Sequence, residues 1–388
     1  MKILFVGSTV KYALEHGLIN GFLRQHHDVK VYSNDKVLRE RTLIDRLKGL
    51  PLRMINLPVL NKPTDNPVLL KRGITHWHRE WVDSNNRNAF NEGLKQVIRD
   101  YVPELVFFFH LHIINESVPR LARSIGAKNF AYFPDDAFAP ELYTQRADGF
   151  VRAMDAIFTT KSFNVDEFKM VGVPNVIFMN KGYNPGCHHP VTPTPEDYQK
   201  YGGDVVFVGT AFESWRIDFM ARLVDACPNV KFRIFGSKWG KTRNPRFYIS
   251  KPARFRSWRN LAPFTGEPII CEDMSLAFAT NKICLALLKQ GTGSVRMRDY
   301  QTSRSIEIPA CKGFMLAEYT DEHAELFKED KEAVYFRSFD QLVEKIQYYL
   351  EHDDERRQIV EAGYQRAMTS GYSYYDYAQQ IIEVYNKL

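Results

Sequence analysis

The chain has 388 residues, 44% of them hydrophobic and 25% charged, which is typical of a globular protein and excludes a disordered or fibrous one. At this length we expect two or three domains. Lys and Arg outnumber Asp and Glu by 52 to 46, so the net charge of +6 favours anionic partners without choosing among them.

The first 180 residues alternate short apolar runs with longer amphipathic segments. The apolar runs predict strands at 2–6, 28–32, 105–109, 129–133, 156–160 and 176–179. Apolar residues at helical spacing predict helices at 13–25, 87–101, 116–125 and 165–171, and a helix that includes 150–154. Continuous apolar strands separated by helices are typical of a parallel sheet covered on both faces.

A second series of the same kind follows a break at 181–202, which contains four prolines and has the composition of a linker. Apolar runs predict strands at 204–208, 231–235 and 314–317, and a strand or buried segment at 282–288. Helices are expected at 217–226, 339–351 and 374–387. The sequence therefore predicts two doubly wound α/β domains, at 1–180 and 203–370, with a final helix in 371–388 that returns to the N-terminal domain.

Cysteines and apolar runs bear on the expected location. The five cysteines are odd in number and contain no C-x-x-C pair, which indicates neither a disulfide framework nor a zinc ribbon and favours a reducing cytosol. The opening run KILFVG is too short for a signal-peptide core, and no run approaches the 18 apolar residues that a membrane span needs. We therefore expect a cytoplasmic protein, at most peripheral to the inner face of the membrane.

The first turn between strand and helix, Gly7-Ser8-Thr9-Val10, lacks two common nucleotide-binding patterns. It contains neither G-x-G-x-x-G nor G-x-x-x-x-G-K-[ST]. This argues against a dinucleotide fingerprint and against a P-loop NTPase. The carboxyl ends of two parallel sheets nevertheless offer a crevice in which ligands of such folds bind.

The strongest local signal is the run RSIEIPACKGFML, which begins at Arg304 and contains Glu307 and Gly313. It places a carboxylate near a helix start and a glycine before an apolar strand. Such a carboxylate can accept two hydrogen bonds from a ribose diol, and a helix N-terminus with nearby cations suits a diphosphate. The competing interpretation is an ordinary surface glutamate.

This run, extended by Leu326-Phe327 and by EAVYF at 332–336, resembles the C-terminal domain of the CgeB-like (spore maturation) glycosyltransferases. The resemblance covers residues 203–375, and weaker similarity extends to 176–190 and 17–32. These proteins are similar to the family 4 glycosyltransferases, whose GT-B fold has two Rossmann-like domains facing across a crevice. The resemblance implies transfer of a sugar from a UDP- or GDP-linked donor to a hydroxyl of a glycan, lipid-linked or protein acceptor.

The resemblance also implies which residues contact the donor. Glu307 matches a glutamate at the ribose, and Asp299, eight positions earlier, stands where the family has a second glutamate. The Gly209-Thr210 turn with Arg216, and Lys282 in an N-K-I segment, would face the leaving diphosphate, whose stabilisation is the main electrostatic task of the transfer. The full set of expected donor-binding residues is Gly209, Thr210, Arg216, Gly236, Lys282, Asp299, Arg304, Glu307 and Gly313.

Candidates for the catalytic base lie in the first domain. Asp135 and Asp136 follow one predicted strand and His110 ends another, where a side chain can reach an acceptor hydroxyl. We slightly favour Asp136 over Asp135, with His110 in reserve; a helix cap is the competing interpretation of the Asp pair. The histidine pairs at 76 and 78, 110 and 112, and 188 and 189 lack a third ligand, so no metal site and no cofactor besides the nucleotide sugar are expected.

The stretch 226–266 has ten basic residues and no Asp or Glu, with aromatic residues interleaved. A basic loop beside a donor diphosphate is the favoured interpretation. The alternatives are a peripheral membrane contact through 231–259 and a nucleic-acid platform, of which the second is the least favoured. The leading hypothesis of a glycosyltransferase therefore stands beside two others, a GT-B sugar-nucleotide epimerase and a nucleic-acid-binding module.

Overall fold

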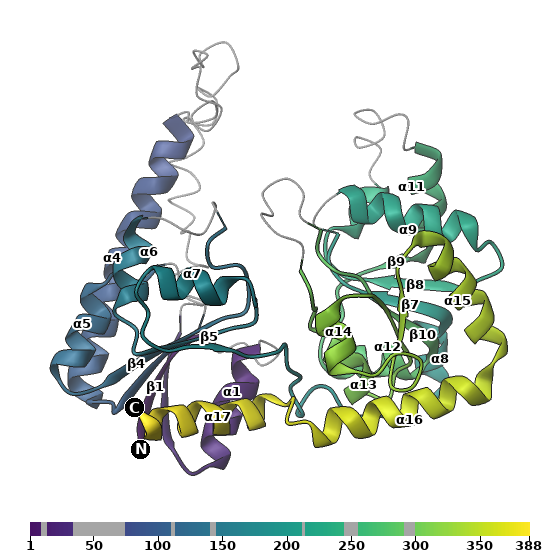
Figure 1. The fold of residues 1–388 in the computed structure, drawn as a ribbon. Coiled ribbons are helices and arrows are strands. Elements are labelled where there is room, and N and C mark those ends of the chain that lie inside the picture. Colours follow the sequence, from purple (N-terminus) through teal and green to yellow (C-terminus); the bar gives the residue numbers. More distant parts are fainter. Residues whose placement is uncertain are drawn as a thin grey trace. The chain divides into compact units, whose positions relative to one another are not determined.

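The computed structural model describes residues 1–8, 14–33, 74–109, 113–139, 145–211, 214–243, 255–290 and 299–388. These residues form two compact units. The first unit contains residues 1–15 and 26–179, and the second contains 16–25 and 180–388 (Figure 1). Each unit is built around its own sheet.

The first unit has a six-stranded sheet in the order β2-β1-β3-β4-β5-β6, and every neighbouring pair is parallel. Its strands are β1 (Lys2–Gly7), β2 (Asp28–Ser33), β3 (Leu105–Phe109), β4 (Lys128–Phe133), β5 (Ala156–Thr159) and β6 (Val176–Phe178). Its helices are α4 (Ile74–Tyr101), α5 (Ser117–Ser124), α6 (Gln145–Arg152) and α7 (Asn164–Met170), and α1 (Leu14–Arg24) follows β1.

Strand β3 shows that both faces of the sheet are covered. All five of its residues are buried, because successive side chains of a strand point to opposite faces and helices cover both. Phe108 packs edge-on against Phe150, whereas its neighbours Phe107 and Phe109 both lie against Phe5. Continuous apolar runs in the sequence therefore predict these strands correctly.

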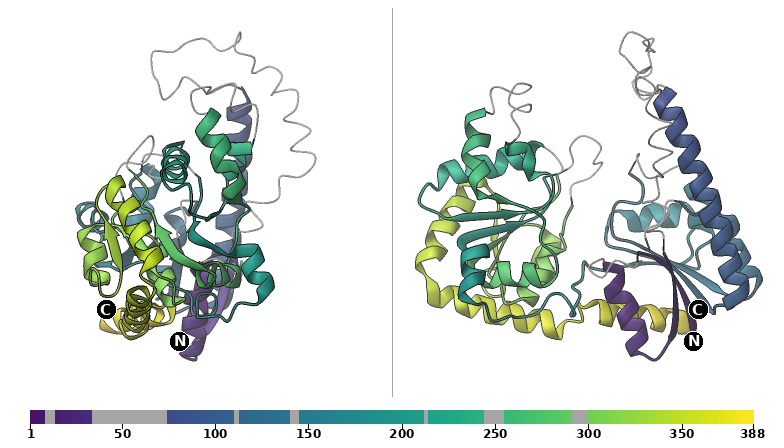
Figure 2. Two further views of the ribbon diagram at one scale, coloured as in Figure 1. Left: turned by 90° about the vertical axis from the view of Figure 1, so that its right-hand side faces the viewer. Right: turned by 180° about the vertical axis from the view of Figure 1, so that it is seen from behind.

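The second unit repeats this plan with the strand order β12-β11-β10-β7-β8-β9, again fully parallel. Its strands are β7 (Gly203–Val208), β8 (Phe232–Phe235), β9 (Thr265–Gly266), β10 (Asn281–Ala286), β11 (Met315–Glu318) and β12 (Val334–Phe336). Its helical segments are α8 (Pro195–Tyr201), α9 (Ser214–Ala226), η2 (Trp239–Arg243), α11 (Phe255–Leu261), η4 (Ala262–Phe264), α12 (Glu272–Ala279), α13 (Arg304–Ala310), α14 (Asp321–Leu326), α15 (Phe339–Glu351), α16 (Asp353–Thr369) and α17 (Tyr374–Lys387). Helices cover both faces of each sheet in Figure 2.

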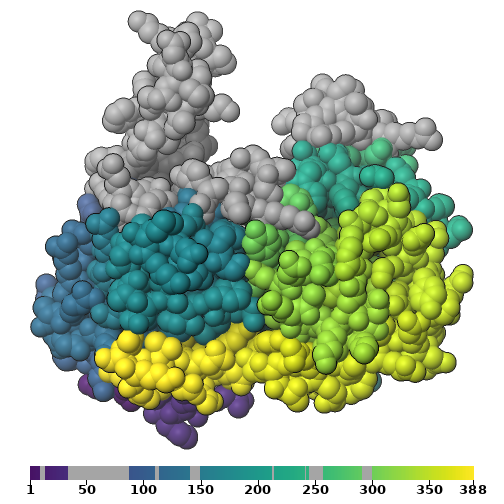
Figure 3. Space-filling model, in the orientation of Figure 1, coloured from purple at the N-terminus to yellow at the C-terminus, as the bar shows by residue number. Residues whose placement is uncertain are grey.

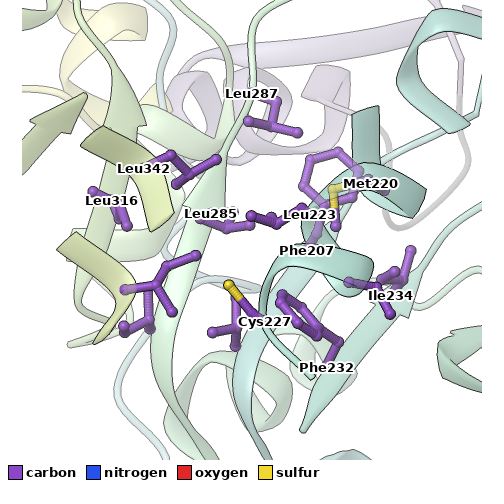
Figure 4. Close-up of a cluster of buried hydrophobic side chains, with 14 of the residues drawn as sticks. Phe207, Met220, Leu223, Cys227, Phe232, Ile234, Leu285, Leu287, Leu316 and Leu342 are labelled. Carbon is purple, nitrogen blue, oxygen red and sulfur yellow. The ribbon is translucent and has the colours of Figure 1, made fainter. Parts of the chain in front are cut away.

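Alternate residues of β7 belong to different core clusters of the second unit. Val205 and Phe207 join the cluster beneath α9, to which Met220 and Leu223 contribute (Figure 4). Val206 and Val208 join the cluster on the other face, beneath α12 and α13. Burial of these apolar side chains is the main stabilising term of such a sheet.

The C-terminal helix α17 packs on α1. A Cβ atom at Gly21 of α1 would come within 2.6 Å of the Ala378 Cβ, and the Arg24 guanidinium lies 4.5 Å from the centre of the Tyr375 ring. This close packing explains why residues 16–25 belong to the second unit. Residues of α16 and α17 lie at the surface in the space-filling view (Figure 3, yellow).

The predicted fold class is confirmed, because both units are parallel α/β sheets of the Rossmann-like kind. Several elements were not expected, among them the short α8, β9 and α12 and the 17-residue α16. Helix α8 lies inside the segment expected to be a linker, and Thr194 begins it with a reciprocal capping box to Asp197. None of the helices among the described residues has the length and apolarity that crossing a bilayer requires.

Candidate functional site

The turns after β7 and β8 are tied together at the carboxyl edge of the second sheet. The Gly209 N–H donates to the Phe235 carbonyl at 2.8 Å, and the Gly209 carbonyl accepts from Trp239 Nε1 at 2.7 Å. The Ser237 hydroxyl donates to Thr210 Oγ1 at 3.0 Å. Gly209 and Thr210 are thus held in a fixed turn at the edge where ligands of parallel α/β sheets bind.

Gly236 must be a glycine for this arrangement. Its φ is +148°, and a Cβ atom there would stand 2.1 Å from the Gly209 carbonyl oxygen. A side chain would therefore force the two turns apart. Gly236, expected from the resemblance to contact the donor, thus permits the close approach of the two turns.

Arg216 of α9 joins two loops at the same edge. It donates from Nη1 to the Thr210 carbonyl at 2.9 Å and from Nη2 to the Leu288 carbonyl at 3.2 Å. Its side chain is buried, and its guanidinium lies 5.1 Å from the centre of the Trp215 ring. Arg216 therefore fixes the loops after β7 and β10 through their backbones.

Arg304 and Glu307 lie one turn apart in α13 and form an ion pair between Arg304 Nη1 and Glu307 Oε2. Arg304 also donates from Nε to the Val208 carbonyl at 2.9 Å, which brings the pair to the end of β7. Only 2% of Glu307 is exposed. Burial lowers the pKa of Arg304 to about 10, so the guanidinium stays protonated at neutral pH.

His188 faces the other oxygen of Glu307. Its Nδ1 accepts the Asn184 N–H at 3.2 Å, so the ring proton of the neutral imidazole lies on Nε2, which is 3.8 Å from Glu307 Oε1. Burial, followed by the positive charge of Arg304, lowers the pKa of His188 to about 3. The His188-His189 pair was considered only as a possible metal site and was not expected near the donor. Its burial beside Glu307 depends on contacts far apart in the sequence.

A disulfide joins Cys187, the neighbour of His188, to Cys271 at the start of α12, 84 residues away. This corrects the expectation that the cysteines form no disulfide. The Ser275 hydroxyl donates to the Cys187 carbonyl at 3.0 Å and adds a second link to α12. The segment that carries His188 is therefore held against α12 by a covalent bond and a hydrogen bond.

The structure does not bring all expected donor residues together. Asp299 does lie near the carboxyl edge, since its N–H donates to the Lys289 carbonyl at 2.9 Å beyond the end of β10. Lys282, however, is the second residue of β10, whose first residue pairs in register with Gly203 at the start of β7. Lys282 thus lies at the amino edge of the sheet. The Gly209 turn is almost the full length of β7 away, and a strand rises about 3.3 Å per residue.

Gly313 lies at the amino edge as well. It occupies the turn between α13 and β11, and its N–H donates to the Ile308 carbonyl at 2.9 Å. A Cβ atom there would approach the Ile308 side chain to 2.9 Å, so the glycine serves close packing of α13 on the sheet. Lys282 and Gly313 therefore cannot contact the diphosphate that Gly209 and Thr210 would hold.

Asp135 and Asp136 follow β4 in the first unit. The Asp136 Oδ1 accepts the Phe138 N–H at 3.1 Å and the Asn164 Nδ2 at 2.9 Å, which closes a turn between β4 and α7. Asp135 is exposed. His110 lies outside the described residues, as does 244–254 of the basic stretch.

The buried neutral state of His188 makes the stability of the protein depend on pH. Between about pH 6.5, the ordinary pKa, and pH 3 the unfolded chain binds a proton at His188 that the folded chain does not. As the pH is lowered from 6.5 to 5, this residue should therefore decrease the free energy of unfolding by about 2 kcal/mol. Above pH 6.5 both states are neutral, so the contribution of His188 is constant. Urea unfolding of wild type and His188→Gln at a series of pH values measures the difference in slope.

His189→Gln supplies the matched control, because His189 is the exposed neighbour in the sequence. Its pH profile should coincide with that of the wild type. Equal slopes for wild type and His188→Gln between pH 6.5 and pH 5 would show that His188 is protonated in the folded protein.

Comparisons with known proteins bear on the fold and on the family of the second domain. A family model described as glycosyl transferase-like matches residues 216–383. This confirms the resemblance to glycosyltransferases for that domain, while the CgeB-like subtype stays a prediction. No curated protein matches the chain.

Several solved structures resemble the whole chain. Sucrose-phosphate synthase from Thermosynechococcus elongatus is 12% identical with a TM-score of 0.63, over 100% of this chain and 99% of that one. HepE from Anabaena, solved with UDP and glucose, is 14% identical with a TM-score of 0.61, over 100% of both chains. UDP-GlcNAc 2-epimerase from Neisseria meningitidis, bound to UDP-GlcNAc, is 12% identical with a TM-score of 0.55, also over 100% of both. The chain therefore has the two-domain fold of GT-B glycosyltransferases and epimerases, and residues 216–383 form its glycosyltransferase-like domain.

Proposed function

We propose that the protein is a glycosyltransferase that moves a sugar from a nucleotide-sugar donor to an acceptor hydroxyl. The observation that carries the proposal is the glycosyl transferase-like match over 216–383, because it contains Arg216, Arg304 and Glu307. Likeness of the fold to HepE, which was solved with UDP and glucose, supports a UDP-linked donor. The run from Arg304 to Leu316 supports the CgeB-like subtype.

Glu307 and His188 together suit a sugar hydroxyl of the donor. In this proposal a ribose hydroxyl donates to Glu307 Oε1 and accepts from the Nε2–H of His188. Glu307 Oε1 and His188 Nε2 are 3.8 Å apart, which is too far for a hydrogen bond between them. Both atoms can therefore bond to the same ligand hydroxyl. The disulfide at Cys187 and the ion pair with Arg304 hold both groups in place.

The turn at Gly209 and Thr210 is proposed to receive the diphosphate. It is fixed by Trp239 and by Arg216, so its backbone needs no reorganisation when the leaving group gains charge. Arg304, which is protonated and bonded to the last residue of β7, supplies positive charge at the same edge. Asp299 is the candidate for the second acidic contact.

Asp135 is the stronger candidate for the base that activates the acceptor. Asp136 Oδ1 accepts two hydrogen bonds that close a turn, whereas Asp135 lies at the end of β4 and is exposed. A glycan, a lipid-linked sugar and a protein hydroxyl are the acceptor classes proposed. Cytoplasmic residence also stays a proposal.

Binding of nucleotides tests this function directly. A ligand at 100 times its Kd raises the free energy of unfolding by about 2.7 kcal/mol, so UDP or GDP should raise the Tm clearly. The matching nucleotide sugar, mixed with glycan, lipid-linked and peptide acceptors, should then give a glycosylated product by mass spectrometry. Absence of both nucleotide binding and sugar turnover would rule the proposal out.

An epimerase is the second candidate, because a UDP-GlcNAc 2-epimerase shares the fold. An epimerase works on the donor alone. Conversion of a nucleotide sugar to its epimer in the absence of any acceptor would favour it over the transferase.

We expect transfer to continue without a divalent ion. The sequence contains no Asp-x-Asp pair at the strand ends of either unit, and Arg304 with the fixed Gly209 turn can hold the diphosphate charge. Activity measured after dialysis against a chelator should therefore stay within about twofold of the untreated enzyme. Loss of activity that manganese restores would contradict this prediction.

A further inference from the structure

A hollow of about 850 Å³ lies at the amino edge of the second sheet, the edge opposite the Gly209 turn. The first residues of β7 and β10, the last turns of α8 and α12, and one side of α16 surround it. None of the residues proposed above to contact the donor or the acceptor lines it. The hollow is therefore separate from the proposed donor site.

Basic side chains dominate the lining of this hollow. Five cationic residues line it, against two acidic ones, Asp204 and Glu361. The cationic residues are Lys231, Lys282, Lys312, Arg356 and Arg357. The hollow therefore carries a surplus of positive charge.

Some of this charge is already neutralised. Lys312 Nζ pairs with Glu361 at 2.7 Å, and Arg356 bonds to Asp353 and to the Tyr349 carbonyl. Within the part of the chain that the structure describes, the ammonium groups of Lys231 and Lys282 have neither a hydrogen bond nor an ion pair, and Lys282 has only a longer-range attraction to Asp353. Two compact cations thus remain available to a ligand.

The strand register brings these two lysines to one side of the sheet. Ile283 pairs with Val205 and Val205 pairs with Phe232, so the preceding residues Lys282, Asp204 and Lys231 form a row across β10, β7 and β8. The two lysine backbones are about 10 Å apart, twice the spacing of neighbouring strands. Long lysine side chains can close that distance around a single ligand. Asp204 between them already accepts the Lys231 N–H at 2.9 Å.

The geometry points to a second anion site, and we propose that this hollow binds a ligand that carries a phosphate or diphosphate group. Lysine ammonium groups bind phosphate as point charges from several directions. Arg357, which lies 3.7 Å and 3.9 Å from its nearest carboxylates, adds a third cation at the opening. The exposed ring of Tyr198 offers an apolar surface for the remainder of the ligand.

Hydrogen exchange of the full chain with inorganic pyrophosphate tests the site. Pyrophosphate should slow exchange of the amides at 202–204 and 280–282, and Lys231→Gln/Lys282→Gln should lower its affinity at least tenfold. Lys328→Gln/Lys331→Gln removes the same charge from exposed lysines of the same unit and should bind as the wild type does. Protection confined to 209–211 and 236–238, or equal affinity of both double variants, would rule out a soluble ligand at this site.

A second arm separates a soluble ligand from a lipid headgroup. Vesicles of phosphatidylcholine with and without phosphatidic acid, which carries a phosphate monoester, are sedimented with each variant. If the protein is retained on phosphatidic acid vesicles and only Lys231→Gln/Lys282→Gln loses this retention, the site binds a lipid headgroup. If pyrophosphate protects the site but the vesicles do not retain the protein, the site binds a soluble ligand. Failure of both arms overturns it. UDP binding should be unchanged in Lys231→Gln/Lys282→Gln, which distinguishes this site from the donor site.

Discussion

Glu307→Gln is expected to lower donor affinity by about tenfold to a hundredfold, because a charge-assisted hydrogen bond to the ribose is lost. It should also lower the free energy of unfolding by about 1–3 kcal/mol, since Arg304 loses its partner in a largely buried position. The loss of stability follows from the buried ion pair with Arg304, which no sequence pattern indicates. Calorimetric titration with UDP and urea unfolding measure the two effects.

A double variant tests whether the loss of stability comes from the unpaired Arg304. Glu307→Gln/Arg304→Met removes both charges, so stability should recover relative to Glu307→Gln alone. UDP affinity should stay low, because both Glu307 and Arg304 are proposed to act on the donor. Glu344→Gln, an exposed carboxylate in α15 of the same unit, controls for the loss of one charge. Recovery of UDP affinity together with stability would show that Glu307 acts only as the partner of Arg304.

The fold was predictable because its signals are local. Strands such as β3 and β7 are buried on both faces, and this burial requires the continuous apolar runs that the sequence displays. Elements that lack a long apolar run of their own were not predicted. Strand β9 has only two residues, and the residue that precedes α12, Cys271, is bonded to a cysteine 84 residues earlier.

The residues expected at the donor lie at both edges of the second sheet, for a reason of topology. Gly209 and Gly236 follow strands, and Arg304 bonds to the last residue of β7, so all three lie at the carboxyl edge. Lys282 and Gly313 belong to family-like segments at or before the start of a strand, and the amino end of a parallel strand lies at the opposite edge. A motif match does not indicate at which end of a strand a residue lies. The register of the paired strands does.

His188 was not among the residues expected at the donor site. An isolated His-His pair has many interpretations, and its position beside Glu307 depends on contacts between residues 184–188, α12 and α13. The neighbouring Cys187 is the only local signal, because a disulfide to α12 fixes the segment. Long-range contacts of this kind are invisible in sequence periodicity.

Asp135→Asn is expected to lower kcat by about 10²–10⁴-fold with the Kd for UDP unchanged, since an amide cannot accept the proton of the acceptor hydroxyl. Asp136→Asn should keep kcat within about threefold of the wild type, because the amide oxygen still accepts the hydrogen bonds from Phe138 and Asn164 that close the turn. The two variants are isosteric with the wild type and adjacent in the chain. Steady-state kinetics with a saturating nucleotide sugar measure both.

The outcomes assign the base among the three candidates. A large loss of kcat in Asp136→Asn alone would return the role to Asp136 and show that its turn opens when the acceptor binds. Near-normal kcat in both Asn variants, with a large loss in His110→Ala, would give the role to the histidine. If none of the three variants loses kcat, proton transfer goes to the leaving phosphate, and the first-unit carboxylates only orient the acceptor. The stereochemistry of the product then separates the cases, because a side-chain base on the face opposite the leaving group inverts the anomeric carbon.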